Sequence, residues 1–225
     1  RHTRYWRHWS SDVCSSDLTV GIRIPKHPIA LGLLREFELM GGHGIAAPSA
    51  NRFGAVSATN VKAVREELEK YESEGTLVLN GGQSKIGLES TIIDFTGKKP
   101  VILRLGVMSL NSDFLSEPPL LAKNTEISYR VPGMLGKHYS PKAAIKINTT
   151  PLAGEGLIAL KEIKTPAGVI RISSPLDLTE YAHCFYESLR QADRLKLSQI
   201  CILIPAKGEQ ISEVLFDRAK RAAAN

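Results

Sequence analysis

Cysteine and long apolar runs are scarce in this sequence. Its 225 residues hold three cysteines, Cys14, Cys184 and Cys201, which stand far apart and form no C-x-x-C pair. Disulfide frameworks and zinc sites need even-numbered or closely spaced cysteines, so we expect structural thiols and no zinc site. A run of about 18 apolar residues, which a membrane helix requires, is absent, as is a signal-peptide pattern. We therefore expect a cytoplasmic protein that does not associate with a membrane.

Several common catalytic motifs are also missing. The sequence contains no G-x-x-x-x-G-K-S/T phosphate loop, no G-x-S-x-G nucleophile elbow and no H-E-x-x-H zinc motif. It does have an apolar fraction of 43%, sufficient for packed cores, and a formal net charge of +6. A modest basic excess is consistent with an anionic substrate or RNA. The composition therefore indicates a globular protein of one large or two modest domains.

The first 18 residues differ from the rest of the chain. Residues 1–18 contain both tryptophans, three arginines and a Ser/Asp-rich tract, without a helical or strand period. One interpretation is a basic aromatic arm for nucleic acid. The interpretation that we favour is a segment foreign to the fold, because the tract resembles translated sequencing-adapter read-through. We therefore expect residues 1–18 to lie outside the fold.

From residue 19 to residue 110, helical and strand patterns are mixed. The predicted elements are a strand at 19–24, a helix at 28–39, a strand at 45–47, a helix capped by Thr59, a strand at 76–79, and an antiparallel hairpin of 90–95 with 101–105. Apolar residues recur every three or four positions in both helices. This region therefore predicts a mixed α+β domain.

The second half of the chain begins with an irregular stretch. Residues 111–142 are rich in proline and glycine and predict a linker. The elements predicted beyond it are strands at 143–147, 156–160 and 168–172, a helix from Thr179, a strand at 200–204 and a helix at 211–224. This order predicts a small open α/β layer with a largely parallel sheet. The whole chain is thus assigned to the α/β class.

Small hydroxyls, amides and arginines stand at the ends of apolar runs in the first half. They fall into four motifs, Arg23-Ile24-Pro25-Lys26-His27, Ala47-Pro48-Ser49-Ala50-Asn51, Gly87-Leu88-Glu89-Ser90-Thr91 and Ile102-Leu103-Arg104-Leu105-Gly106. Strand ends are rigid and the loops beyond them are accessible, so such positions often contact ligands. The set suits an anionic ligand.

In this order, the four motifs resemble the YrdC/Sua5 family of threonylcarbamoyl-AMP synthases. The stretch from Pro132 to Pro141 is similar to the interdomain linker of the two-domain Sua5 branch, and Asp217 to Ala223 is similar to the end of its second domain. The resemblance implies a YrdC-like twisted sheet with helices at 19–110, a linker at 111–142 and a small Rossmann-like α/β domain at 143–225.

The resemblance also implies a reaction. Enzymes of this family make threonylcarbamoyl-AMP and pyrophosphate from L-threonine, bicarbonate and ATP, usually with Mg²⁺, for the modified adenosine next to the anticodon of tRNA. Implied partners are tRNA or double-stranded RNA and a downstream threonylcarbamoyl transferase complex. A threonine carbamate attacks the α-phosphorus of ATP, so catalysis rests on positioning and charge stabilisation, and no nucleophilic side chain is needed.

Matched to the family, several residues acquire roles. The resemblance implies nucleotide contacts for Arg23, Ala47, Ser49, Asn51, Ser57, Arg104 and Tyr139, and threonine contacts for His27 and Ser90. Each has a simpler alternative, such as a turn cap for Ser49 and Asn51 or a surface position for His27. Tyr139 is either a packed linker aromatic or part of a lid that closes over the nucleotide and excludes water.

One departure from the family leaves a second function open. The P-T-x-T-x-Y-G-L and K-x-R-P segments of the family's opening third have no counterpart here, so we expect uncovered sheet edges and core faces in the first domain. The family is therefore implied more firmly than activity of this chain. The alternative is a non-catalytic RNA-binding module, to which Lys26, Lys62, Arg65 and Lys85 would contribute.

Overall fold

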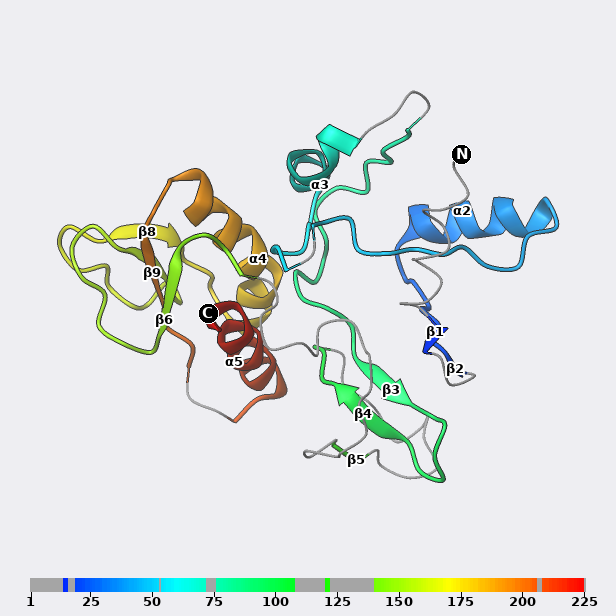
Figure 1. Cartoon of the computed structure of the whole chain (residues 1–225). Coiled ribbons are helices and arrows are strands. Elements are labelled where there is room, and N and C mark those ends of the chain that lie inside the picture. The colour runs from blue at the N-terminus through cyan, green and yellow to red at the C-terminus, as the bar shows by residue number, and fades with distance from the viewer. Residues whose placement is uncertain are drawn as a thin grey trace. The chain divides into compact units, whose positions relative to one another are not determined.

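The computed structural model describes residues 14–15, 19–52, 54–71, 76–107, 120–121, 140–205 and 208–224. The chain divides into two compact units, each formed by separate stretches of sequence, and Figure 1 labels their elements. Unit 1 comprises Arg1–Ala47, Ile92–Arg104 and Leu110–Met134, and unit 2 comprises Pro48–Thr91, Leu105–Ser109 and Leu135–Asn225. None of the described helices is long and apolar enough to cross a membrane. The mixed helices and strands confirm the α/β class.

The described residues of unit 1 form short strands and one helix. Its strands are β1 (Cys14–Ser15) antiparallel to β2 (Thr19–Val20), and β3 (Ile92–Asp94) antiparallel to β4 (Val101–Arg104), which is parallel to β5 (Leu120–Leu121). The predicted hairpin is therefore confirmed. The predicted strand at 19–24 is wrong beyond Val20, and the strand at 45–47 is wrong. Apart from the half-buried Pro25, residues 21–27 and 45–47 are exposed, and no strand pairs with them in the described part of unit 1.

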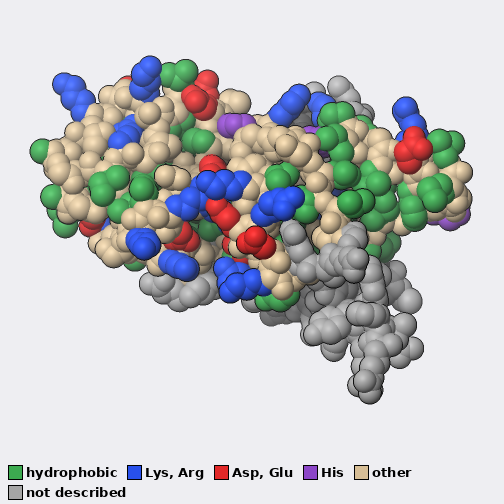
Figure 2. Space-filling model, turned by 90° about the horizontal axis from the view of Figure 1, so that it is seen from above, with side chains coloured by type: hydrophobic (Ala, Val, Ile, Leu, Met, Phe, Trp, Pro, Cys, Tyr) green, Lys and Arg blue, Asp and Glu red, His purple; other side chains and the backbone are tan. Residues whose placement is uncertain are grey.

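The helix of unit 1, α2 (Pro28–Leu39), has the bounds that its apolar spacing predicts. Pro28 occupies its first position, and Gly41, with φ of +86°, follows its end in the left-handed region that glycine tolerates. None of the residues of α2 is buried, although it carries apolar side chains such as Leu33 and Phe37. Figure 2 shows apolar side chains at the surface on the right, where Figure 1 has α2.

The core of unit 2 is a parallel sheet. Its four strands stand in the order β6 (Ala144–Ile147), β9 (Gln199–Ile202), β7 (Gly156–Ile158) and β8 (Ile170–Ser173). All neighbouring strands are parallel, as the alternation of strands and helices in the sequence predicts. The predicted strands of this region are confirmed to within two residues at each end.

Two helices, α4 (Leu178–Arg194) and α5 (Gln210–Ala223), cover one face of this sheet (Figure 1). Phe185, Leu189 and Leu215 are fully buried in the core that they form with the sheet. Burying each such side chain contributes about 1.5–3 kcal/mol. The other face carries Leu157 and Cys201 and is covered by loops. As expected, the thiols of Cys184 and Cys201 are free, and burial raises the pKa of Cys184.

The amino-terminal part of unit 2 contains α3 (Val61–Leu68), followed by the 3-10 helix η1 (Glu69–Tyr71). The helix is present as predicted, but its cap is Asn60 and not Thr59, because the extended backbone of Asn60 lets its side chain accept a hydrogen bond from the Ala63 amide at 2.9 Å. The strand predicted at 76–79 is wrong, since these residues pair with no strand among the described residues.

Candidate functional site

Four of the predicted site residues lie in unit 1. Arg23 and Ala47 are exposed in segments without regular structure, and Arg104 ends β4 opposite Ile92. His27 is the N-cap of α2, where its Nδ1 atom accepts a hydrogen bond from the Ile29 amide at 3.3 Å. His27 therefore has a local structural role, and its contact with threonine stays a prediction.

Four others, Ser49, Asn51, Ser57 and Ser90, lie in unit 2. Ser49 and Ser90 are exposed. The Asn51 side chain holds a turn, because its amide nitrogen donates to the carbonyl of Arg52 at 3.0 Å and of Ala55 at 3.1 Å. Its Oδ1 atom is buried and has no hydrogen-bond partner among the described residues. A buried acceptor of this kind usually has a partner.

Ser57 binds a residue that the sequence did not mark as a ligand, Glu89, which directly precedes Ser90. The Ser57 hydroxyl donates to Glu89 Oε1 at 2.9 Å, and Ser90 is the next residue in the chain. The other oxygen, Oε2, accepts from the Tyr186 hydroxyl at 2.6 Å and from Arg218 Nε at 3.0 Å. Ser57 and the motif at 87–91 are therefore joined to each other and to α4 and α5 through one carboxylate.

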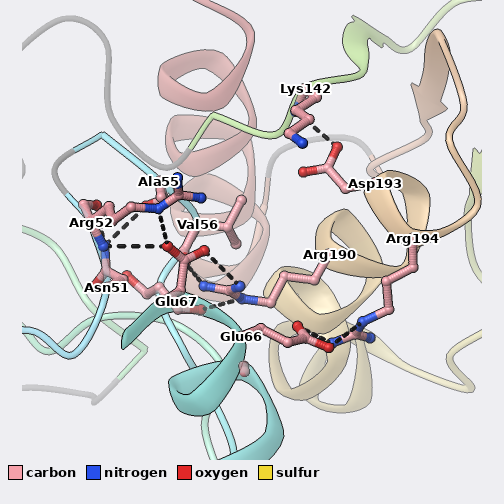
Figure 3. A network of polar contacts seen from close by, with 12 residues as sticks. Asn51, Arg52, Ala55, Val56, Glu66, Glu67, Lys142, Arg190, Asp193 and Arg194 are labelled. Atoms are coloured by element: carbon pink, nitrogen blue, oxygen red, sulfur yellow. Dashed lines mark hydrogen bonds and ion pairs between the residues drawn. The ribbon is translucent and has the colours of Figure 1, made fainter. Parts of the chain in front are cut away.

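A second set of contacts joins the same motif to α4 (Figure 3). Arg190 Nη1 lies 3.0 Å from Glu67 Oε1 of α3, and its Nη2 donates to the carbonyl of Val56. Arg52 Nε binds the other oxygen of Glu67 at 2.8 Å. Arg190 and Glu67 are both nearly buried, and removing one partner of a buried ion pair leaves an uncompensated charge. The backbone before Ser57 is thus fixed by α4.

Electrostatics at this contact favour the charged forms. Burial by itself raises the pKa of Glu67, but hydrogen bonds and charges from Arg52 and Arg190 outweigh it, so the pKa of Glu67 lies below its ordinary value. The hydrogen bond with Glu67 raises the pKa of Arg52, and that with Glu66 raises the pKa of Arg194. Glu67 is therefore ionised where it faces Arg52 and Arg190.

Two glycines allow the segments to approach closely. A Cβ atom on Gly87 would lie 2.1 Å from the carbonyl oxygen of His183, and one on Gly106 would lie 2.4 Å from the Thr91 amide nitrogen. The Gly87 amide donates to the Ala182 carbonyl at 3.1 Å, and the Gly106 amide donates to Thr91 Oγ1 at 3.1 Å. Both glycines belong to the predicted motifs, and a larger residue at either position would push the segments apart.

Other predicted features fall partly outside the described residues. Tyr139 lies outside them, as do 1–13, 16–18 and most of the predicted linker. The residue after Tyr139 is described, and the Ser140 amide donates to the Gly54 carbonyl at 3.0 Å. The described residues contain no cluster of three or more His, Cys, Asp or Glu side chains that suits a metal ion.

The residues that the sequence reasoning missed are Glu89, Tyr186, Arg190 and Arg218. One signal was present, because Arg190 and Arg218 adjoin Leu189 and Ala219, which belong to the apolar sides of the two amphipathic helices. An arginine buried on the apolar side of a helix needs a charged or carbonyl partner. The sequence did not show that Arg190 binds the backbone before Ser57, or that Arg218 binds Glu89.

Comparison with protein families matches nearly the whole chain. A family described as telomere recombination, which includes the Sua5, YciO and YrdC proteins, matches residues 4–106. A family described as the threonylcarbamoyl-AMP synthase C-terminal domain matches residues 107–224, which is more than half of the chain.

Individual proteins agree with the family matches. The threonylcarbamoyl-AMP synthase of Pyrococcus abyssi is 34% identical over 139 residues, covering 59% of this chain and 38% of that protein. The corresponding Bacillus subtilis protein is 36% identical over 134 residues, covering 57% of this chain and 36% of its own length. The matched region thus spans less than two fifths of these relatives.

Solved structures resemble the fold of this chain. The structure of P. abyssi Sua5 complexed with L-threonine has a TM-score of 0.72 and 26% identity, covering 91% of this chain and 64% of that one. A variant of the same protein, in which a histidine and a tyrosine are replaced by alanine, has a TM-score of 0.70 at 25% identity, covering 91% and 62%.

Proposed function

Since the chain belongs to the two-domain threonylcarbamoyl-AMP synthase family, we propose that it acts in making threonylcarbamoyl-AMP and pyrophosphate from L-threonine, bicarbonate and ATP. The observation that carries the proposal is the junction of two motifs at Glu89, which ties Ser57 to the segment of Ser90. In the matched roles, Ser57 belongs to the nucleotide and Ser90 to threonine. One carboxylate would thus hold the nucleotide contact Ser57 close to the segment that carries the threonine contact Ser90.

The chemistry that we assign to the chain is positioning. The threonine amine captures bicarbonate as a carbamate, whose oxygen attacks the α-phosphorus of ATP with pyrophosphate leaving. Arg23 and Arg104 would neutralise phosphate charge, Ser49 and the backbone at Ala47 would donate to phosphate oxygens, and the buried Oδ1 of Asn51 would accept a hydrogen bond from the nucleotide. His27 and Ser90 would hold the threonine end.

The role of Ser57 differs from that of a simple phosphate donor. A hydroxyl has one proton, and Ser57 gives it to Glu89, whose carboxylate can only accept. The Ser57 oxygen therefore keeps lone pairs, which suit the Mg²⁺ that accompanies ATP. Mg²⁺ commonly combines substrate phosphates and water with one or two protein oxygens. We assign Ser57 to the cation and Ser49 to phosphate.

We extend the proposal to the linker. His138-Tyr139 is the sole His-Tyr pair of the sequence, and a solved variant of the Pyrococcus relative replaces one histidine and one tyrosine by alanine. Ser140, the next residue, donates from its amide to the carbonyl of Gly54, three residues before Ser57. We assign to Tyr139 a contact with the nucleotide, and to the linker the exclusion of water from the labile carbamate.

The partners and location that we propose follow from the reaction. The product would pass to a threonylcarbamoyl transferase complex that modifies tRNA, in the cytoplasm, where ATP, bicarbonate and tRNA are all present.

The alternative, a module that binds RNA without catalysis, would use exposed cations such as Lys62 and Arg65 of α3. Turnover separates the two functions, because a module that only binds RNA releases no pyrophosphate.

The test measures pyrophosphate release and incorporation of labelled bicarbonate into an adenylate by the chain. We expect both to require ATP and L-threonine together. Arg104→Ala should weaken ATP binding by about 1.5–3 kcal/mol in isothermal titration, the range for a lost charge-assisted hydrogen bond, whereas Lys98→Ala in the same hairpin should not. RNA binding without pyrophosphate release would favour the alternative and contradict the synthase.

A further inference from the structure

We propose that Arg218, in the last helix of the chain, is a positioning residue for the nucleotide site. The inference rests on the proposed function and adds to it a residue that acts through Glu89. Arg218 binds Glu89, and Glu89 binds Ser57 and precedes Ser90. Two predicted ligands are therefore connected to α5 through a single carboxylate.

The contacts of Arg218 reach two of the predicted motifs. Its side chain is 1% exposed, and its Nε atom donates to Glu89 Oε2 at 3.0 Å. Its Nη2 atom donates to the Leu105 carbonyl at 2.8 Å, and its Nη1 atom donates to Asp217. Leu105 directly follows Arg104, the predicted phosphate ligand. One guanidinium thus fixes the motif of Glu89 and the backbone next to Arg104.

The same backbone has a second attachment to α5. Gln210, the first residue of α5, donates from Nε2 to the Gly106 carbonyl at 2.8 Å. Gly106 packs against Thr91, which leaves no space for a side chain. The carbonyls of Leu105 and Gly106 are therefore both held by α5, Gly106 by its first residue and Leu105 by Arg218 in its second half.

The two carboxylate oxygens of Glu89 have different partners: one binds side chains of α4 and α5, and the other binds Ser57. Oε2 accepts from Tyr186 at 2.6 Å and from Arg218, whereas Oε1 accepts from Ser57 at 2.9 Å. Because the carboxylate is planar, fixing Oε2 also fixes Oε1 and the hydroxyl bound to it. The orientation of Ser57 is thus determined by side chains of α4 and α5 that are distant in the sequence. Arg218 and Glu89, for example, are 129 positions apart.

An ion pair with only a structural role would stabilise the fold, and its loss would leave the kcat of the folded chain unchanged. Glu89 is 15% exposed, so water can reach it once Arg218 is gone, and the carboxylate can turn away from Ser57. A displacement of about 1 Å in a positioning group lowers the rate by up to about a hundredfold. The effect should therefore appear in kcat more than in the KM for ATP.

The experiment compares Arg218→Met with Arg221→Met in the full chain. Arg221 lies on the same helix and also binds Asp217, at 2.9 Å, but does not contact Glu89 in the described structure. We expect Arg218→Met to lower kcat for adenylate formation about tenfold or more with less than about a threefold change in KM, while Arg221→Met stays within about twofold. Equal kcat values for the two variants would overturn the proposal.

Hydrogen exchange provides a readout that does not need turnover. Arg218→Met should speed amide exchange at 54–57 and 87–91, and Arg221→Met should not. If Arg218→Met fails to fold by circular dichroism, Tyr186→Phe removes one bond to the same oxygen and should raise exchange at 87–91. Unchanged exchange in the folded variants would show that Arg218 does not hold the motifs. Absence of adenylate from the unaltered chain would contradict the proposed function, and the exchange result would still decide the role of Arg218.

Discussion

The helices α2 and α4 share one apolar spacing and have opposite environments. Both contain apolar residues that recur every three or four positions; α2 has its predicted bounds, and α4 begins one residue before the predicted start at Thr179. Yet α4 buries eight of its residues, including Phe185 and Leu189, whereas α2 buries none. The spacing therefore determines that a helix forms, and the neighbouring elements determine whether its apolar side contributes to stability.

The largest expected effect comes from making the same substitution in both helices. Phe185 is 0% exposed in α4, and Phe37 is 38% exposed in α2. Phe185→Ala should lower the free energy of unfolding by about 3–5 kcal/mol, because it creates a cavity in a packed core. Phe37→Ala should lower it by about 1 kcal/mol or less. Urea denaturation followed by circular dichroism measures both.

Equal losses for the two variants would show that α2 is as well packed as α4. Hydrogen exchange in each helix serves as the control, because the chain has two compact units and a single unfolding transition is not assured. Exchange in α2 should respond to Phe37→Ala only, and exchange in α4 to Phe185→Ala only.

The second comparison is between two neighbouring acids of α3. Glu67 is 8% exposed and binds Arg190 and Arg52, whereas Glu66 is 36% exposed and binds Arg194. Glu67→Gln should destabilise unit 2 by about 1.5–3 kcal/mol, because buried arginine loses a charged partner. Glu66→Gln should change stability by less than about 1 kcal/mol, as exposed ion pairs do. If thermal denaturation gives the same shift in melting temperature for both variants, burial does not determine how much each ion pair between α3 and α4 stabilises the chain.

The pH dependence of stability follows from the same carboxylate. The pKa of Glu67 is lower in the folded chain than its ordinary value, so its contribution is fully present above the unfolded pKa of about 4.3. It is lost as pH falls through the lower folded pKa, since the folded state then takes up a proton at the expense of the ion pairs. Unfolding free energies measured from pH 6 to pH 3 should therefore fall less steeply for Glu67→Gln than for the unaltered chain. Parallel curves would assign the acid sensitivity to other groups.

The sequence predicts regular elements well where they are long or where their partners are near in the chain. The helix at 28–39, the helix predicted to begin at Thr179 and the hairpin of β3 and β4 are examples. The strands predicted at 45–47 and 76–79 do not exist, because a short apolar run becomes a strand only if another strand pairs with it. The choice of Asn60 over Thr59 as a cap depends on one extended backbone conformation, which composition does not specify.

The candidate site was predicted in part for a related reason. The ordered motifs marked Ser57 and Ser90 from local patterns, and the structure ties their segments together at Glu89. The partners of Glu89 lie on α4 and α5, about a hundred or more residues further on, where no local pattern relates Tyr186 or Arg218 to a motif. Contacts of this kind become visible only when the chain has folded.

The smallest expected effect concerns the caps of α2 and α4. Asp177 caps α4 through a hydrogen bond to the Glu180 amide at 2.8 Å, and His27 caps α2 at 3.3 Å. Asp177→Ala should lower stability by about 1 kcal/mol, a typical value for a lost cap, and His27→Ala by less than about 0.5 kcal/mol, because the bond is long and exposed.

Two substitutions at His27 distinguish its predicted contact with threonine from its role as the cap of α2. His27→Asn keeps a good capping side chain but removes the imidazole, whereas His27→Ala removes both. If His27 contacts threonine, the two variants should weaken threonine binding equally in isothermal titration, although only His27→Ala loses the cap. If the residue is only a cap, His27→Asn should bind threonine as the unaltered chain does. In that case the exposed position of His27 would be explained by α2 alone, and Ser90 would remain as the sole assigned threonine contact.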